Sequence, residues 1–83
     1  MEIRPTWRPF EGPADTPRSA LPDSVFAFPE KRAEPLTDAS HVRSAIARFD
    51  QVTHVTASER ELAERNIEAA AQYYGVTVKH KEF

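Results

Sequence analysis

The sequence predicts a small all-α protein, in which two helices form an antiparallel hairpin that is covered by an extended apolar arm. Two segments repeat apolar residues at the spacing of one helical face. Each of them begins with residues that cap helices. A third segment, at residues 25–28, is apolar and is closed by Pro29. The chain has 83 residues and no cysteine, so its core is small and is not reinforced by disulfides. The apolar arm therefore has to be buried against the helices.

Residues 1–20 are predicted to be a proline-rich flexible arm. Prolines stand at positions 5, 9, 13 and 17, and each removes a backbone donor and favours extended conformations around it. Trp7 and Phe10 are the aromatic residues of this arm. They either pack on the domain or anchor a partner.

Residues 21–78 are predicted to be a single small helical domain. Leu21-Pro22-Asp23-Ser24 has the composition of a turn. Phe26 and Phe28 then alternate, as in an extended segment with one buried face. We predict that this segment lies on the two helices as the third layer of the core.

The first helix is expected at residues 38–51. Thr37 or Asp38 can accept a hydrogen bond from the first turn and cap it. The apolar face follows the spacing i, i+3, i+4 and i+7 and consists of Val42, Ala45, Ile46 and Phe49.

The second helix is expected at residues 57–74. Two overlapping capping boxes mark its start, one from Thr56 to Glu59 and one from Ser58 to Glu61. Gly75 marks its end, because helices commonly finish with a left-handed glycine. Residues 76–79 alternate like a short strand or an extended tail, and residues 79–83 are the predicted C-terminal tail.

Charge and hydropathy narrow the class of protein. Eleven basic and thirteen acidic residues give a net charge of −2 and are interspersed along the chain. This near balance argues against nucleic-acid binding, which draws its free energy from cations on phosphates. No apolar run approaches the roughly 20 residues of a membrane span, and the first residues do not resemble a signal peptide. Together with the lack of cysteine, this predicts a soluble cytoplasmic protein that contacts no membrane.

One polar stripe of the first helix is a candidate binding site. At 100° per residue, His41, Ser44 and Arg48 share a flank beside the apolar face, and Arg43 lies on the opposite flank with Asp50. Imidazole, hydroxyl and guanidinium groups together can hold a phosphate or a carboxylate. The alternative is that these residues bond the folded-back arm: Arg48 or Arg43 would then bind Asp23, or His41 a backbone carbonyl.

Catalysis is not expected. A triad can be written from Ser40 or Ser44 with His41 and Asp38, but adjacency in sequence is not the hydrogen-bonded series that a triad requires. Asp38 is better explained as a helix cap. We therefore predict no catalytic residue and no enzyme.

No motif for a metal, a cofactor or DNA is apparent either. The three histidines, at positions 41, 54 and 80, match no local ligand spacing, and two glycines in the whole chain do not make a phosphate loop. As the recognition helix of a helix-turn-helix, the second helix would open with Glu59, Glu61 and Glu64, which do not suit base edges. No metal and no cofactor is predicted.

Residues 21–78 resemble a family of small uncharacterised bacterial and phage-associated proteins, a domain of unknown function. The resemblance is carried by the pattern Leu-Pro-Asp-Ser, Phe-Ala, Pro, Arg, Pro-Leu-x-Asp-x-x-His-x-Arg and Ala-x-Ala-Arg, followed by Ala-Ala-Gln-Tyr-Tyr-Gly-Val. The positions of the first part are Leu21, Pro22, Asp23, Ser24, Phe26, Ala27, Pro29, Arg32, Pro35, Leu36, Asp38, His41, Arg43, Ala45, Ala47 and Arg48. The resemblance implies an interaction or accessory role and transfers no activity, ligand or catalytic residue.

The sequence thus predicts a non-enzymatic helical module that binds another protein or itself, within a phage-related or multiprotein assembly. The contacts would come from the proline-rich arm with Trp7 and Phe10, and from any apolar surface that the Phe26/Phe28 arm leaves open. Further candidate contacts with a partner or an anion are His41, Ser44, Arg48, Arg43 and Arg32. The alternative is a nucleic-acid accessory protein with a local basic patch. That patch would consist of Lys31, Arg32, Arg43 and Arg48.

Overall fold

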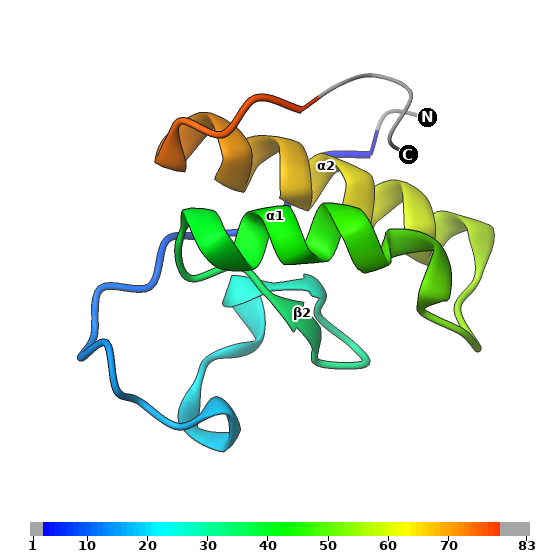
Figure 1. Cartoon of the computed structure of the whole chain (residues 1–83). Helices are drawn as coiled ribbons and strands as arrows, with labels where there is room; N and C mark the ends of the chain where they lie inside the picture. Colours follow the sequence, from blue (N-terminus) through cyan, green and yellow to red (C-terminus); the bar gives the residue numbers. More distant parts are fainter. Residues whose placement is uncertain (1–2, 79–83) are drawn as a thin grey trace.

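The computed structural model describes residues 3–78 and shows two α-helices packed with a short two-stranded sheet (Figure 1). The sheet consists of β1 (Phe26–Phe28) and β2 (Ala33–Pro35), and the helices are α1 (Ala39–Arg48) and α2 (Ala57–Tyr74). Three single-turn 3-10 helices complete the described elements: η1 (Arg18–Ala20), η2 (Asp23–Val25) and η3 (Phe49–Gln51). The prediction of an all-α protein is therefore wrong, because the fold is α+β.

The extended arm is one strand of a β-hairpin rather than an isolated segment. β1 pairs with β2 antiparallel, with Phe26 opposite Pro35 and Phe28 opposite Ala33. The turn between them is closed by the N–H of Arg32, which donates to the carbonyl of Pro29 at 3.3 Å. Arg32 and Glu34 adopt positive φ angles of 50° and 59°. Residues other than glycine, asparagine, aspartate and histidine rarely adopt this backbone conformation, so the sequence carries no turn signal at these positions.

Strand β1 is buried along its whole length, with Phe26, Ala27 and Phe28 at most 2% exposed. Ala27 and Phe28 belong to the main core, whereas Phe26 belongs to a smaller cluster with Leu21 and Val25. Strand β2 is only half-buried. The apolar residues of the arm are therefore buried against their own chain, as predicted. They pack into two separate clusters, however, and not into a single core.

Both helices occur where their periodicity places them. Asp38 caps α1 by accepting a hydrogen bond from the N–H of His41 at 2.8 Å, and the predicted last turn of this helix is the 3-10 turn η3. In α2, the first of the two candidate capping boxes is used: Thr56 and Glu59 bond each other's backbone N–H groups at 3.1 and 2.8 Å. Gly75 ends α2 with a φ of 72°.

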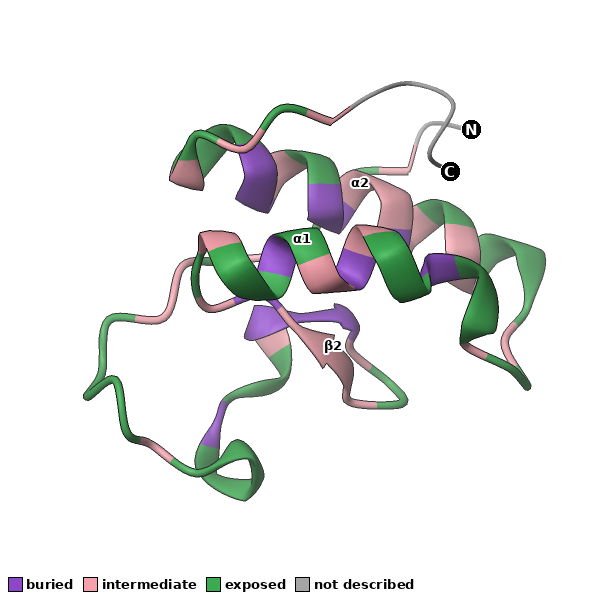
Figure 2. Ribbon diagram, viewed as in Figure 1, coloured by how far each residue is buried: buried purple, intermediate pink, exposed green. Residues whose placement is uncertain are grey.

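The main core lies between the two helices and β1, and the buried residues of these elements are purple in Figure 2. Alanines of α1 and α2 make up a large part of it, and their small side chains allow the elements to approach closely. Its buried members are Ala27, Phe28, Leu36, Val42, Ala45, Phe49, Ala63, Ile67, Ala70 and Ala71.

A buried asparagine joins the N-terminal segment to this core. Asn66, which is 0% exposed, accepts hydrogen bonds from the N–H groups of Thr6 and Trp7 at 2.8 and 2.9 Å. Its amide donates to the hydroxyl of Thr6 and to the carbonyl of Ala27. Residues 6 and 7 are thereby tied to α2 and, through Asn66, to β1.

The ends of the chain bear on two further predictions. The predicted boundaries at residues 20 and 78 stay predictions, and the tail at residues 79–83 lies outside the described residues. Residues 76–78 form no strand.

Within residues 3–78, neither helix has the length and apolar character that crossing a bilayer requires.

Candidate interaction surfaces

The predicted polar flank of α1 borders a groove of about 520 Å³, which we call the histidine groove. His41, Ser44 and Arg48 form its α1 side, so the structure brings these three predicted residues together. The facing side comes from the N-terminal segment, the 3-10 helix η1 and strand β2. The other lining residues are Phe10, Ala14, Thr16, Arg18, Leu21, Glu34, Pro35 and Thr37.

The start of α1 fixes the position of His41. The Nδ1 atom of His41 lies 2.8 Å from the Oδ1 atom of Asp38, the same oxygen that caps the helix. The backbone N–H of His41, followed by its side chain, lowers the pKa of the Asp38 carboxyl. Neither Ser40 nor Ser44 forms a hydrogen bond with His41 among the described residues. These distances describe a helix cap with an attached imidazole, as the sequence suggested for Asp38.

Arg48 is the unengaged cation of the histidine groove. It is exposed, and within residues 3–78 its side chain has no hydrogen-bond or ion-pair partner. Arg18 is the second cation, and it donates to the carbonyl of Arg32 from the opposite wall. Glu34 is the single carboxylate of the lining, and the Asp38 carboxylate lies next to the groove, bonded to His41.

The arm is held by arginines other than those expected. Asp23 forms an ion pair with Arg32, not with Arg48 or Arg43 as the alternative interpretation proposed. Arg32 also donates to the carbonyls of Arg18 and Leu21, and its guanidinium lies 4.7 Å from the centre of the Phe26 ring. Arg32 thus satisfies the backbone of the irregular segment and covers the small apolar cluster.

Both aromatic residues of the N-terminal segment contact the domain. The indole N–H of Trp7 donates to the carbonyl of Leu36 at 3.1 Å. Its ring meets Tyr73 and Tyr74 edge-on at 5.7 and 5.8 Å, and burial raises the pKa of Tyr74. Phe10 packs against the small cluster around Phe26. Trp7 and Phe10 therefore take the packing role that the sequence left open beside partner binding.

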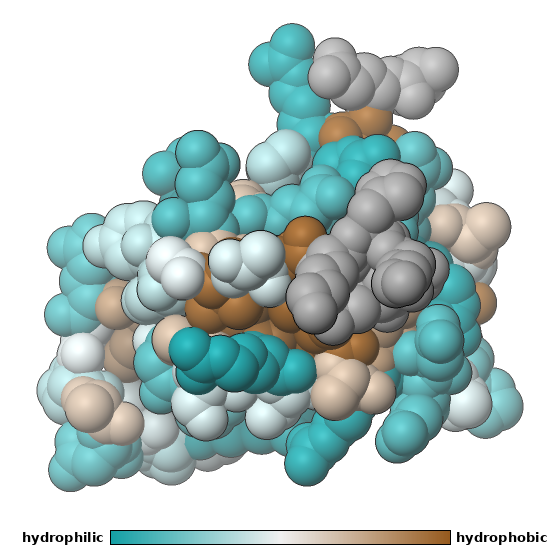
Figure 3. All heavy atoms as spheres, turned by 45° about the horizontal axis from the view of Figure 1, so that its top comes forward, coloured by the Kyte–Doolittle hydropathy of each residue, from teal (hydrophilic) through white to brown (hydrophobic). Residues whose placement is uncertain are grey.

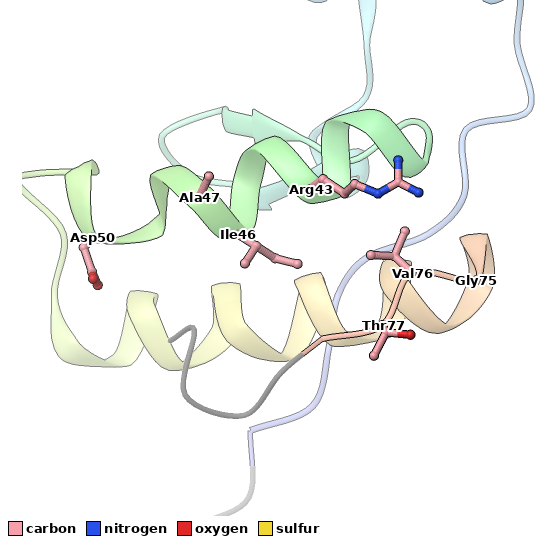
Figure 4. Close-up of a pocket in the computed structure, with 7 residues that line it drawn as sticks. All are labelled: Arg43, Ile46, Ala47, Asp50, Gly75, Val76 and Thr77. Atoms are coloured by element: carbon pink, nitrogen blue, oxygen red, sulfur yellow. The ribbon is translucent and has the colours of Figure 1, made fainter.

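The opposite flank of α1 borders a second groove of about 660 Å³, which we call the valine groove (Figure 4). Arg43 and Asp50 lie toward its two ends, and Ile46 points into it between them. The far wall is the segment that follows α2. The lining residues are Arg43, Ile46, Ala47, Asp50, Gly75, Val76 and Thr77. Apolar side chains also reach the surface in the middle of the face shown in Figure 3.

The four cations of the nucleic-acid hypothesis are not gathered into one groove. Arg43 lines the valine groove, Arg48 lines the histidine groove, and Arg32 is engaged with Asp23. Lys31 is exposed in the turn of the β-hairpin. Among residues 3–78, no group of three histidine or acidic side chains is placed to hold a metal ion.

Two features of the structure were not predicted from the sequence. Asn66 interrupts the apolar stripe formed by Ala63, Ile67 and Ala70 at helical spacing, and this polar residue on a buried face was a readable signal. The valine groove depends on how the segment after Gly75 returns beside α1, and no local pattern predicts that return.

The structure is a small α+β domain with a groove on each side of one helix. The chain belongs to a family of unknown function (DUF6582), which it matches over residues 8–81. No curated protein and no solved structure matches the chain. The predicted resemblance to an uncharacterised family is thus confirmed at the level of unknown function, whereas the phage association stays a prediction.

Proposed function

We propose that the protein is a non-enzymatic interaction module that binds an acidic segment of another protein in the histidine groove. The observation that carries this proposal is the exposed guanidinium of Arg48, which has no partner within residues 3–78 and lies beside a concave surface that Arg18 also lines. A groove of about 520 Å³ has the size of typical ligand sites.

The groove combines the two contacts that a peptide segment needs. Arg48 presents a planar fork of donors that suits a carboxylate, and the hydroxyl of Ser44 is a further donor on the same flank. Phe10, Leu21 and Pro35 supply apolar surface on the opposite side. A peptide with one or two carboxylates next to an apolar residue fits this lining best.

A protein partner accounts for the charges better than nucleic acid does. Two arginines in the groove, one of them bonded to the hairpin, neutralise few phosphates, and each neutralised phosphate contributes to affinity. A single carboxylate-bearing segment needs only one free guanidinium. We further propose that the module works in a cytoplasmic multiprotein assembly. The resemblance to phage-associated proteins supports a phage-related one.

The test is a binding scan with defined probes. An array of 12-residue peptides, acidic and neutral, each with one or two aromatic residues, is titrated against the full chain labelled with nitrogen-15. We expect acidic peptides to shift the amide signals of His41, Ser44 and Phe10. Arg48→Ala should weaken the tightest of them about tenfold, the usual effect of removing a charge-assisted hydrogen bond.

Arg43→Ala is the matched control, because it removes the same side chain from the opposite flank of the same helix. It should leave peptide affinity unchanged. Equal losses from the two variants, or a preference for neutral peptides, would contradict the assignment of the histidine groove. A single-stranded oligonucleotide that bound more tightly than any peptide, with an affinity falling steeply as salt rises, would favour the nucleic-acid alternative instead.

A further inference from the structure

The valine groove has a charge pattern that is complementary to itself, and from it we infer that this face pairs with a second copy of the chain. Arg43 and Asp50 carry opposite charges and are equally far along the sequence from the midpoint between Ile46 and Ala47. When two such faces meet across a two-fold axis through that midpoint, each Arg43 lies opposite Asp50 of the other copy. A two-fold interface requires this property of a single patch.

Helical geometry places the four residues on one face. Arg43, Ile46 and Ala47 lie in α1, and Asp50 lies in the 3-10 turn η3 that continues it. At about 100° per residue in α1 and about 120° in η3, the four positions span an arc of about 100°. At about 1.5 to 2.0 Å per residue, Arg43 and Asp50 are about 10–12 Å apart along the axis. All four residues line the same groove (Figure 4). Two copies of α1 that run antiparallel bring both charged pairs into register at once.

The surface between the charges is suited to close contact. Ala47 is exposed and small, so that two backbones can approach at the axis, while Ile46 is half-buried and points into the groove. Val76, on the far wall, supplies apolar surface against which Ile46 of the second copy can pack. Neither Arg43 nor Asp50 has a hydrogen-bond or ion-pair partner among the described residues. Within residues 3–78, both charges are thus available to the second copy.

This pairing is independent of the proposed peptide site. The histidine groove and the valine groove lie on opposite flanks of α1 and have no lining residue in common. A variant that breaks the pair should therefore leave peptide binding unchanged. Variants of Arg48 should leave self-association unchanged.

The test uses sedimentation velocity on the full chain at concentrations up to about 1 mM, because exposed ion pairs contribute little each and the pair is expected to be weak. The parent should move toward twice the monomer mass as concentration rises. Arg43→Asp or Asp50→Arg alone turns both ion pairs into like-charge contacts and should weaken self-association at least about tenfold.

The decisive sample is the mixture of these two single variants. Arg43→Asp presents two acidic residues and Asp50→Arg presents two basic residues, so equal amounts should form a mixed pair although neither variant pairs with itself. The double variant, with the charges exchanged, should pair like the parent. Arg48→Asp and Glu61→Arg serve as matched controls, since they make the same charge changes at exposed positions outside the valine groove.

A parent that stays monomeric at about 1 mM, or single reversals that self-associate as strongly as the parent, would overturn the inference. So would a mixture with no more association than its components. A chain shortened to end at Val78 gives a further check: it should pair at least as strongly as the full chain. Pairing lost on that truncation would assign the contact to residues beyond the groove.

Discussion

Asn66→Ala is the substitution with the largest expected effect for a polar residue of this chain. It removes an amide that accepts from two backbone N–H groups and donates to the Ala27 carbonyl and the Thr6 hydroxyl. A buried polar group left without its partner costs about 1–3 kcal/mol. The Ala27 carbonyl would lose its hydrogen bond and could not replace it with water, because Ala27 is 0% exposed. The N–H groups of Thr6 and Trp7 can recover water only if their segment leaves α2.

We therefore expect the free energy of unfolding to fall by about 2–4 kcal/mol. A domain of this size has about 4–12 kcal/mol in total, so this is a large share. Urea titration provides the measurement, with the fluorescence of Trp7, the single tryptophan of the chain, reporting the N-terminal segment and circular dichroism reporting the helices. Gln72→Ala is the control, since it removes an exposed amide from the same helix and should change stability by less than about 0.5 kcal/mol. If Asn66→Ala were as mild as this control, the network would not stabilise the fold.

Three further substitutions test the core, a helix start and a helix end. Phe28→Ala empties a site that is 2% exposed and lies beside Phe49, and should cost about 3–5 kcal/mol by chemical denaturation; an unchanged midpoint would exclude the strand from the core. The pKa of Asp38 is lowered by the N–H of His41, so its stabilisation is complete above the ordinary pKa of 3.8 and is lost as the pH falls through the lower value of the folded state. The stability difference between the parent and Asp38→Asn should shrink in acid, and a difference that stays constant down to about pH 2 would contradict this assignment. Gly75→Ala should lower the free energy of unfolding by about 1–2 kcal/mol, measured by thermal unfolding, because φ at this position is 72° and only glycine adopts this angle without strain. A Cβ would meet open space, so the backbone strain is the whole cost. A neutral result would show that the turn relaxes.

The two helices were predictable because their signals are local. A period of 3.6 residues and a capping group need only neighbours in sequence. Val42 and Ala45 of α1 and Phe49 of the following turn η3 are buried as their spacing requires, whereas Ile46 is half-buried. The helix α2 begins and ends where Thr56 and Gly75 placed it. These residues act within one turn of themselves, so tertiary context did not displace them.

The β-hairpin was missed because its second strand has no strand signal. Residues 33–35 read Ala-Glu-Pro, of which none favours a sheet. The turn before them places Arg32 at positive φ with no glycine to announce it. The strand forms because β1 and α1 both pack against it. These contacts are tertiary, and single-sequence patterns do not contain them.

Only one wall of the histidine groove could be predicted, because the other wall depends on tertiary contacts. A helical wheel placed His41, Ser44 and Arg48 on one flank, and these residues do line one groove. The opposite wall comes from residues 10–21, whose path depends on Arg32 bonding to Asp23 and to two carbonyls. A wheel describes one element only, so the second wall of each groove requires the assembled fold.

The arrangement of the two grooves has a consequence for binding strength. If α1 pairs with its copy through the valine groove, the two histidine grooves lie on the flanks that point away from the shared axis, because the flanks of α1 are opposed. Each pair then carries two equivalent peptide sites. A partner that displays its acidic segment twice would bind the pair with an effective concentration set by the distance between the sites, and its apparent affinity would exceed that of either site alone. A modest single-site affinity, which one free guanidinium and a shallow apolar wall imply, is therefore compatible with stable attachment to a repetitive assembly.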